Sequence, residues 1–396
     1  MTVETRASAP SSGKPRVALY SFNIVNLFRA SATGMVGGAE VQYHLLAHHL
    51  AAEFDVHVVT LAPAPPDDLV VPPGFTLHLV SPAHDDPSRN RVAVFVGRSR
   101  SFWRAFKAAD AQVYLERGAG FATFLTWLYA RLHRRRFVYH WASDADLKGL
   151  FMKEFPGIRP FYRLARRHAD AQVCQTEAQL AMLSPRERRR ATIIPNSLDT
   201  RIAWRPADGP EVLWVGTIKG ETKRPDLFLD LAAALPHRRF RMVGEVRGGA
   251  GFQEAFKARA ATLPNVTVTG FVPRAQLPGQ YRHGRVLVNV SDHEGFPNTF
   301  LEACACGVPV VSLNVDPNGI LARQGVGTFL AGDKAGLAPA VERLFQDGPW
   351  QEARKACAEV ARQHQPATAA RRVADLIHRL LGERRANLPQ AQNPQN

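Results

Sequence analysis

Two glutamates in the second half of the chain have the spacing of a ligand-binding pair. Glu294 and Glu302 stand eight positions apart, and the string between them holds a glycine, a proline and the start of a predicted helix. A loop and about one and a half helical turns then separate the two carboxylates by roughly 10 Å. That distance is too long for sharing one proton or one small metal ion. It suits two parts of a larger ligand, such as the hydroxyls of two sugar rings.

A strand, a loop, a helix and a second strand are expected to hold this pair. Residues 286–290 are strand formers, and Pro297 suits the first residue of a helix that runs to about Cys306, where Gly307 ends it. Glu294 therefore follows the carboxyl end of a strand, which is where open parallel sheets bind ligands.

The start of this helix is a candidate anion site. We expect the backbone N–H groups of Asn298, Thr299 and Phe300 to be free of intrahelical partners and to favour a phosphate. A phosphate site between two hydroxyl-binding carboxylates matches the outline of a nucleotide sugar.

The longer string from residue 294 to 312, E-G-F-P-N-T-F-L-E-A-C-A-C-G-V-P-V-V-S, is more specific than the two glutamates. It resembles the E-x7-E signature of the retaining glycosyltransferase family 4, whose members have the GT-B fold, an α/β fold of two Rossmann-like domains facing each other across a cleft. The resemblance implies that Glu294 holds the transferred sugar and supports positive charge on its ring, and that Glu302 binds the ribose. The other donor contacts that it implies here are Gly295, Phe296, Asn298 and Thr299. The alternative is that both glutamates are ordinary surface carboxylates.

A second motif, W-V-G-T-I-K-G-E-T-K-R-P-D from residue 214, follows a predicted strand and precedes a helix that begins near Pro225. The resemblance implies that Gly216 and Thr217 lie at the donor and that Lys223 neutralises its diphosphate, a leaving group that needs positive charge already in place. The family commonly has an arginine directly after the glycine, where this chain has Thr217. The candidates for the missing charge are Lys219, Arg224 and Arg247, or the Thr217 hydroxyl itself.

Two features of the first half also point to a cleft. Gly38 ends a glycine loop between a predicted strand at residues 16–20 and a helix, and the resemblance implies that this loop faces the donor phosphate and the acceptor. His140 stands near the end of the strand F-V-Y-H-W. A buried core histidine is the ordinary interpretation, but the resemblance implies contact with the transferred sugar, which makes His140 a catalytic candidate.

Asp144 and Asp146 form a D-x-D that invites a metal-binding interpretation, because hard carboxylate oxygens suit Mg²⁺ or Mn²⁺. Ser143 or Asp144 more simply caps the next helix. We therefore expect no required metal and no cofactor, only a nucleotide-sugar co-substrate.

The chain has room for two domains, with 396 residues of which 45% are hydrophobic, and its alternating strands and helices favour parallel sheets. Residues 16–200 are predicted to form an acceptor-binding domain and residues 201–365 a nucleotide-sugar-binding domain. A helical stretch at 351–381 includes a last helix, 366–382, that the resemblance places back on the first domain. Tails at 1–15 and 383–396 are predicted to be disordered.

Much of the net charge of +15 comes from three arginine clusters in the first half, at residues 131–136, 163–167 and 186–190. No nucleic-acid recognition module accompanies them, so we expect no nucleic-acid partner. The clusters are either solvated helix faces or a surface for anionic lipid. Four scattered cysteines, no signal peptide and no membrane span predict a cytoplasmic protein, with peripheral attachment to the inner face of the membrane as the lipid alternative.

These features together predict a retaining, metal-independent glycosyltransferase that moves a sugar from a nucleotide-sugar donor to a saccharide or lipid-linked acceptor in cell-surface polysaccharide or glycoconjugate synthesis. Two alternatives stay open: a nucleotide-sugar epimerase of the same fold, and a non-catalytic saccharide-binding subunit.

Overall fold

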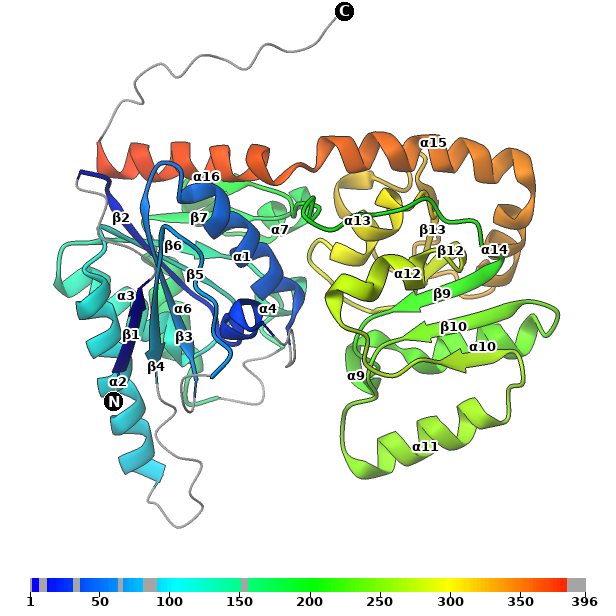
Figure 1. Cartoon of the computed structure of the whole chain (residues 1–396), viewed down its shortest axis with the longest axis horizontal. Helices are drawn as coiled ribbons and strands as arrows, with labels where there is room; N and C mark the ends of the chain where they lie inside the picture. Colours follow the sequence, from blue (N-terminus) through cyan, green and yellow to red (C-terminus); the bar gives the residue numbers. More distant parts are fainter. Residues whose placement is uncertain are drawn as a thin grey trace, which may run out of the picture.

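Two β-sheets divide the chain into two α/β domains (Figure 1). The computed structural model describes residues 2–6, 13–30, 36–62, 67–80, 91–150 and 156–382. The first sheet has the strand order β1-β4-β3-β2-β5-β6-β7-β8, and the second has the order β11-β10-β9-β12-β13-β14. Apart from β1, neighbouring strands pair in parallel. The predicted GT-B architecture is confirmed.

The first domain places helices on both faces of its sheet. Its strands are β1 (Thr2–Arg6), β2 (Arg16–Tyr20), β3 (Asp55–Leu61), β4 (Phe75–Val80), β5 (Val113–Arg117), β6 (Arg136–His140), β7 (Ala171–Cys174) and β8 (Ala191–Ile193). Its helices are η1 (Ile24–Phe28), α1 (Gly38–Leu50), α2 (Arg91–Ala109), α3 (Phe121–Leu132), α4 (Asp144–Leu147), α6 (Arg159–Arg167), α7 (Glu177–Met182) and α8 (Pro185–Arg188).

The second domain repeats the pattern around a smaller sheet. Its strands are β9 (Glu211–Val215), β10 (Arg239–Val243), β11 (Val266–Val268), β12 (Gly284–Asn289), β13 (Val310–Ser312) and β14 (Gly327–Phe329). Its helices are α9 (Gly220–Lys223), α10 (Pro225–Ala234), α11 (Ala250–Ala261), η2 (Arg274–Gln276), α12 (Leu277–Tyr281), α13 (Asn298–Ala305), η3 (Pro317–Gly319), α14 (Leu337–Phe345) and α15 (Asp347–Gln363). The predicted strand, loop, helix and strand around Glu294 are β12, α13 and β13, and Gly307 ends the turn after α13 with a φ of 66°.

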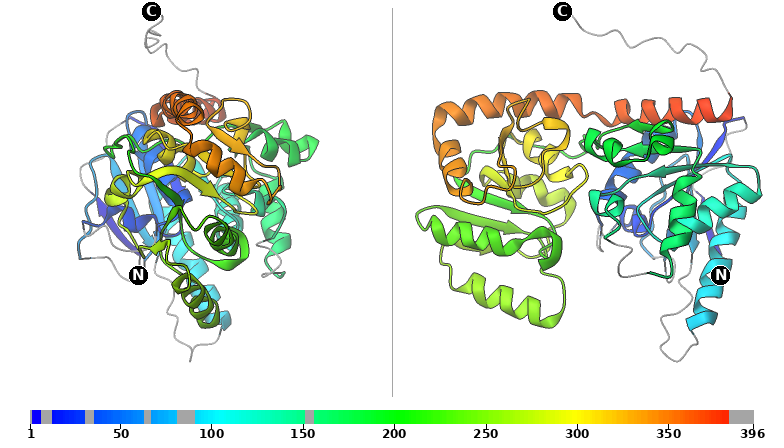
Figure 2. Two further views of the ribbon diagram at one scale, coloured as in Figure 1. Left: turned by 90° about the vertical axis from the view of Figure 1, so that its right-hand side faces the viewer. Right: turned by 180° about the vertical axis from the view of Figure 1, so that it is seen from behind.

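The last helix, α16 (Pro366–Leu381), belongs to the first domain by its contacts. Its buried side chains, among them Val373 and Ile377, join the core formed with Leu46 and Leu50 of α1. Helices α15 and α16 follow one another along one side of both domains (Figure 1, Figure 2). Together with the segment at residues 194–210, they connect the two halves.

Three expectations about the ends of elements differ from the structure. Part of the predicted N-terminal tail is ordered: β1 pairs antiparallel with β4, because the outer edge of that strand offers unpaired backbone groups. The helical stretch predicted at 351–381 begins four residues earlier, at Asp347, and it breaks at the predicted start of the last helix, because Pro366 has no N–H to donate and Gln365 before it is extended. The sequence suggests a helix from about residue 101 to 109, but α2 begins ten residues earlier, at Arg91. Residues 7–12 and the predicted tail at 383–396 lie outside the described residues.

All four cysteines are free and buried, as predicted. Within the described ranges, no helix has the length and apolar character needed to cross a membrane.

Candidate functional site

A cavity of about 220 Å³ lies between the two domains. One wall is the glycine loop before α1, and the other is formed by loops that follow β9, β10 and β11 together with the start of α13. This wall is the carboxyl edge of a parallel sheet, where ligands bind. The predicted site residues that line the cavity are Gly38, Gly216, Thr217, Asn298, Thr299 and Glu302.

Glycines in the loops after β9 and β10 allow these two loops to approach one another closely. Gly244 follows β10 with a φ of 148°, and a Cβ built on it would lie 1.8 Å from the carbonyl oxygen of Gly216, which follows β9. Only a residue without a side chain allows this approach.

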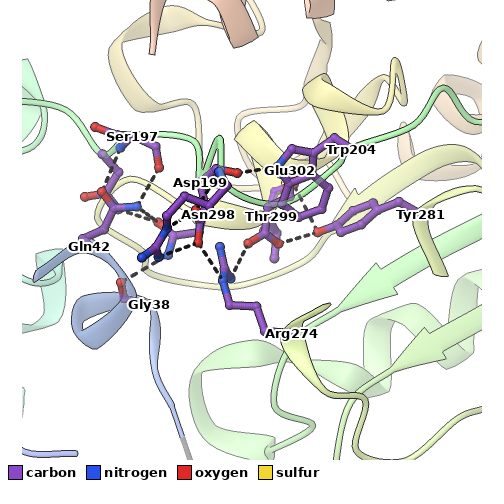
Figure 3. A network of polar contacts seen from close by, with 12 residues as sticks. Gly38, Gln42, Ser197, Asp199, Trp204, Arg274, Tyr281, Asn298, Thr299 and Glu302 are labelled. Atoms are coloured by element: carbon purple, nitrogen blue, oxygen red, sulfur yellow. Dashed lines mark hydrogen bonds and ion pairs between the residues drawn. The ribbon is translucent and has the colours of Figure 1, made fainter. Parts of the chain in front are cut away.

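Asn298 links the domains through its side chain (Figure 3). Its Oδ1 accepts hydrogen bonds from Gln42 Nε2 at 3.1 Å and Asn196 Nδ2 at 2.9 Å, and its Nδ2 donates to the carbonyl of Gly38 at 3.2 Å. The side chain is therefore engaged in holding α13 against the first domain, and the backbone is the part of Asn298 available to a ligand.

The N-terminus of α13 offers fewer donors than predicted. The N–H of Phe300 donates to the carbonyl of Pro297 at 3.2 Å, so the expectation that it is free is wrong. No hydrogen-bond acceptor among the described residues engages the N–H groups of Asn298 and Thr299. These two groups and the positive end of the helix dipole suit an anion.

Glu302 lies at the base of the cavity and is only 3% exposed. Its two carboxylate oxygens each accept one hydrogen bond, from Arg274 Nη1 at 2.9 Å and from the Tyr281 hydroxyl at 2.9 Å (Figure 3). Burial alone would lower the pKa of Arg274, but the Glu302 and Asp199 carboxylates outweigh it and raise that pKa. The carboxylate of Glu302 is therefore fixed in orientation, and each oxygen keeps a second lone pair for a ligand hydroxyl.

The structure brings Lys223 and Glu294 together, as predicted. In it, however, the two side chains pair with one another. Lys223 Nζ forms an ion pair with Glu294 Oε1 beside the cavity, and neither residue is part of its lining. The N–H of Asp292 donates to the carbonyl of Thr222 at 2.9 Å, which fixes the end of α9 to the loop after β12. Both side chains are partly exposed, so the pair can open toward a ligand.

Gly295 and Phe296 attach this loop to the first domain and do not line the cavity. A Cβ at Gly295 would lie 2.8 Å from the Ala142 carbonyl oxygen and 2.8 Å from Gln175 Nε2. Phe296 is 2% exposed; its N–H donates to Gln175 Oε1 at 2.9 Å, and its carbonyl accepts from Asn196 Nδ2 at 2.6 Å. The sequence predicted that Gly295 and Phe296 contact the donor. In the structure they pack against the first domain instead, and this tight packing leaves no space for a ligand beside them.

His140 is not brought to the interdomain cavity. It is 6% exposed and lines a separate internal cavity of about 20 Å³ between α1 and α16. Gln42 and Asn196 line that small cavity as well and also bond Asn298, so they stand between His140 and the cleft. Burial and the nearby Arg117 hold the pKa of His140 well below its usual value, so the ring is neutral.

Of the two predicted caps, Ser143 or Asp144, it is Ser143 that caps α4. Ser143 and Asp146 form a reciprocal capping box, in which Asp146 Oδ2 accepts from the Ser143 N–H at 3.1 Å. Asp144 Oδ1 accepts from Gln179 Nε2 at 3.0 Å. In the part of the chain that the structure describes, no three His, Cys, Asp or Glu side chains are grouped as metal ligands.

Of the candidates for the positive charge that family members commonly have directly after the glycine, Arg247 is the one that lines the cavity. It lines the cavity with Thr217, and its N–H donates to the carbonyl of Ile218 at 2.8 Å, which joins the loops after β9 and β10. Its guanidinium Nε donates to Glu245 Oε2 at 2.8 Å on the exposed rim. Of the other candidates, Arg224 pairs with Asp226 at 2.8 Å, and neither it nor Lys219 lines the cavity.

Several residues that organise the site carry no signal in the sequence. They are Gln42, Gln175, Asn196, Arg274 and Tyr281, which come from four separate segments, because Arg274 and Tyr281 both lie on the continuous stretch of η2 and α12. Each is an ordinary polar residue, and its function follows only from the contact that the fold creates.

Comparisons with known proteins agree with this architecture. The chain matches the family described as Glycosyltransferase Family 4 over residues 36–202 and that described as Glycosyl transferases group 1 over residues 209–347. A D-inositol 3-phosphate glycosyltransferase of Frankia alni is 36% identical over 158 residues, which are 36% of this chain and 39% of the relative. A protein of the same name from Kineococcus radiotolerans is 27% identical over 351 residues, which are 77% of this chain and 79% of the relative. The chain spans about two fifths of the length of the Frankia alni relative it matches.

Solved structures share the fold over nearly the whole chain. Sucrose-phosphate synthase from Thermosynechococcus elongatus has a TM-score of 0.73 at 20% identity and covers 93% of this chain and 99% of its own. Anabaena Alr3699/HepE in complex with UDP-glucose has a TM-score of 0.69 at 16% identity and covers 92% and 100%. WaaG, a glycosyltransferase involved in lipopolysaccharide biosynthesis, has a TM-score of 0.66 at 17% identity and covers 91% and 99%.

Two facing α/β domains with a cavity at the carboxyl edge of the second sheet define a protein of the GT-B class. The first domain matches the Glycosyltransferase Family 4 model and the second matches the Glycosyl transferases group 1 model, and the chain belongs to glycosyltransferase family 4.

Proposed function

We propose that the protein transfers a sugar from a nucleotide-sugar donor, held in the interdomain cavity, to a saccharide or lipid-linked acceptor. The observation that carries this proposal is the convergence on one cavity of the oriented Glu302 carboxylate, the two free N–H groups at the start of α13 and the glycine loops. In this arrangement Glu302 binds the ribose and the α13 N-terminus binds the diphosphate. Phe271, which also lines the cavity and is 51% exposed, provides an apolar surface for the base.

The Lys223–Glu294 ion pair supports a mechanism in which the donor exchanges the partners of both side chains. Lys223 turns to the diphosphate, where its charge stabilises the departing group, and Glu294 accepts hydroxyls of the transferred sugar. The departing phosphate then helps to deprotonate the acceptor on the same face, so the anomeric configuration is retained. Lys223, Arg247 and the helix N-terminus supply the positive charge that this route requires, and no metal has a role in it.

The acceptor would approach from the first domain, whose glycine loop at Gly38 forms the facing wall. The curated relatives are named for transfer to an inositol phosphate. The fold neighbour WaaG is described as acting in lipopolysaccharide biosynthesis, which supports a role in making cell-surface polysaccharide or glycoconjugate.

A further part of the proposal is that the first domain attaches to anionic lipid on the cytoplasmic side of the membrane. On α6, Phe161 and Leu164 are 43% and 42% exposed, and Arg163 and Arg167 lie beside them. Exposed apolar side chains among arginines favour an interface with acidic headgroups. Sedimentation with anionic vesicles at low salt tests this part of the proposal, and recovery of all the protein in the supernatant would reject it.

The donor proposal is tested by thermal shift with UDP-, GDP- and ADP-sugars, because a ligand of the native state raises the unfolding temperature. Lys223→Ala is expected to weaken binding of the stabilising donor by about 1.5–3 kcal/mol, the range for a hydrogen bond to a charged group. Lys355→Ala, at an exposed position of α15 outside the cavity lining, is the matched control.

Unchanged donor affinity and unchanged turnover in Lys223→Ala would remove this lysine from the site. Turnover of the donor without any acceptor, with the sugar epimerised, would identify the epimerase alternative instead. A wild-type protein that no nucleoside diphosphate sugar stabilises would contradict the donor site itself.

A further inference from the structure

Two of the three arginine clusters, separated by about fifty residues in the sequence, meet in one cavity of about 420 Å³ in the first domain. The arginines that line it are Arg131, Arg134, Arg135, Arg136, Arg186 and Arg190. The same cavity contains Asp170, the one carboxylate among the residues that line it. Arginine runs that look like separate solvated faces in the sequence therefore form a single concave basic site.

This site lies at the edge of the sheet opposite the interdomain cavity. Strand β6 begins at Arg136, and Asp170 and Arg190 directly precede β7 and β8, so the site is at the amino ends of these strands. Five-residue β6 alone spans about 15 Å. Arg136 Nε donates to the carbonyl of Leu380 at 3.1 Å, and the end of α16 lies far from the second domain (Figure 1).

The charge of this cavity is only partly compensated within the protein. Arg135 pairs with Asp110 at 2.7 Å, and Arg136 pairs with Asp170 at 3.1 Å. No carboxylate in the described parts of the chain lies within ion-pairing distance of the remaining arginines at 131, 134, 186 and 190. Like charges gathered in a concave surface repel one another, and an anion bound among them would relieve that repulsion.

The apolar part of the cavity adds a second, independent observation. Trp127 lines it, and the indole N–H is buried with no hydrogen-bond partner among the described residues. An unpaired buried donor is unfavourable, and an oxygen of a ligand bound in this cavity is a candidate acceptor for it.

We infer that this arginine cavity binds a phosphate group with more than one negative charge, as in a phosphomonoester or a pyrophosphate. Guanidinium groups fit such a group because their planar N–H pairs bind two oxygens at once, which a compact ammonium cannot do. The ligand is either a soluble phosphate compound or a lipid headgroup with a terminal phosphate. The site is distinct from the donor cleft and does not depend on the proposed transfer reaction.

The test compares two triple variants at one fixed ionic strength. The cavity variant is Arg131→Gln/Arg134→Gln/Arg186→Gln, which removes arginines that pair with no carboxylate in the described ranges. The control variant is Arg239→Gln/Arg343→Gln/Arg371→Gln, which removes the same charge from exposed positions outside the cavity. The probes are pyrophosphate, titrated by calorimetry, and vesicles of phosphatidic acid in phosphatidylcholine, assayed by sedimentation. Because pyrophosphate also fits the donor cleft, each titration is repeated in a Lys223→Ala/Arg247→Ala background.

The expected result is binding by the wild type and the control variant, and a loss of at least about tenfold in affinity for the cavity variant. Binding of pyrophosphate alone would identify a soluble phosphate as the ligand, and binding of phosphatidic acid alone would identify a lipid headgroup. Equal affinity of the two triple variants, or no binding of either probe by the wild type, would overturn the inference. Thermal unfolding checks that the cavity variant is folded, and the three single substitutions replace it if it is not.

Discussion

At the scale of single residues, the charged side chains that line the interdomain cavity or that we assign to the donor are already paired with one another. Lys223 faces Glu294, Arg274 faces Glu302, and Arg247 faces Glu245. The buried pair at Glu302 is fixed by Tyr281, whereas the Lys223 and Arg247 pairs are partly exposed. We therefore expect the exposed pairs to exchange partners when a diphosphate binds and the buried pair to stay intact.

Arg247→Ala is predicted to weaken the binding of the nucleoside diphosphate that stabilises the wild type by about 1.5–3 kcal/mol, or roughly 10- to 150-fold. The physical reason is that Arg247 is the cation beside Thr217 on the cavity wall, where family members commonly have an arginine. Adding Thr217→Arg to this variant should restore most of the affinity, because it returns a guanidinium to the same end of the cavity. Calorimetric titration measures both effects.

Arg259→Ala, which removes an exposed arginine of α11 that pairs with Asp230, is the control for this prediction. A Thr217→Arg/Arg247→Ala protein that binds no better than Arg247→Ala would show that position 217 cannot reach the diphosphate. An Arg247→Ala protein with wild-type affinity would exclude Arg247 from the site.

Glu116 gives a pH-dependent prediction that is independent of ligands. This residue of β5 is 2% exposed and accepts one hydrogen bond from Thr123 Oγ1 at 2.9 Å, and burial raises the pKa of its carboxyl to about 8. Between pH about 4.5 and 8 the native state holds a proton that the unfolded chain releases, so this group lowers stability as pH rises, by up to about 1.4 kcal/mol per unit. In Glu116→Gln this contribution to the pH dependence of stability should be absent, because the amide does not titrate. Urea unfolding of both proteins from pH 5.5 to 7.5 measures it, and parallel pH profiles would disprove it.

At the scale of elements, the loop at residues 294–296 makes two different kinds of contact. Its Glu294 side chain faces α9, while its backbone docks on the first domain through Gln175, Asn196 and the carbonyl of Ala142. The second domain is thus held closed by backbone contacts of the same loop that carries a predicted catalytic carboxylate. Domain closure and the position of Glu294 are therefore coupled.

Gly295→Ala is predicted to separate this loop from the first domain, because its Cβ would lie 2.8 Å from both the Ala142 carbonyl oxygen and Gln175 Nε2. We expect a more open molecule with weaker donor binding and nearly unchanged secondary structure. Small-angle scattering and donor titration measure these effects. Gly279→Ala in α12, where an added Cβ meets nothing within 4 Å, is the control and should behave as the wild type.

At the scale of the whole molecule, the C-terminal helix completes the core of the domain that begins the chain. Ile377 of α16 is fully buried against α1, and His378 Nε2 lies 3.2 Å from Glu53 Oε2. Because α15 packs on the second domain and α16 on the first, the short break at Gln365 is one of the points about which the domains can move relative to each other.

Ile377→Ala is predicted to cost about 2–5 kcal/mol of unfolding free energy, the range for such a deletion in a packed core. The loss should fall on the first domain, so a separate early unfolding transition is expected while the second domain unfolds as in the wild type. Differential scanning calorimetry measures this, and Arg371→Ala on the exposed face of α16 is the control. One transition shifted as a whole would show that the domains unfold together.

The sequence by itself determined the two-domain fold and the loop at residues 294–302. Alternating strands and helices leave a parallel sheet as the natural solution, and local rules of proline, glycine and strand-forming residues place β12, α13 and β13 correctly. The Ser143 cap was also predictable, because a capping box involves neighbours in the chain.

Only the tertiary structure decided which side chains meet. His140 at a strand end is separated from the cleft by Gln42 and Asn196, and Gly295 and Phe296 are used in docking, because contacts between distant segments are set by the packing of whole elements. The same reason explains why Arg274 and Tyr281 went unpredicted beside Glu302, and why two distant arginine clusters form one cavity. Local pattern specifies an element and its ends, but the partner of a side chain depends on how the elements pack.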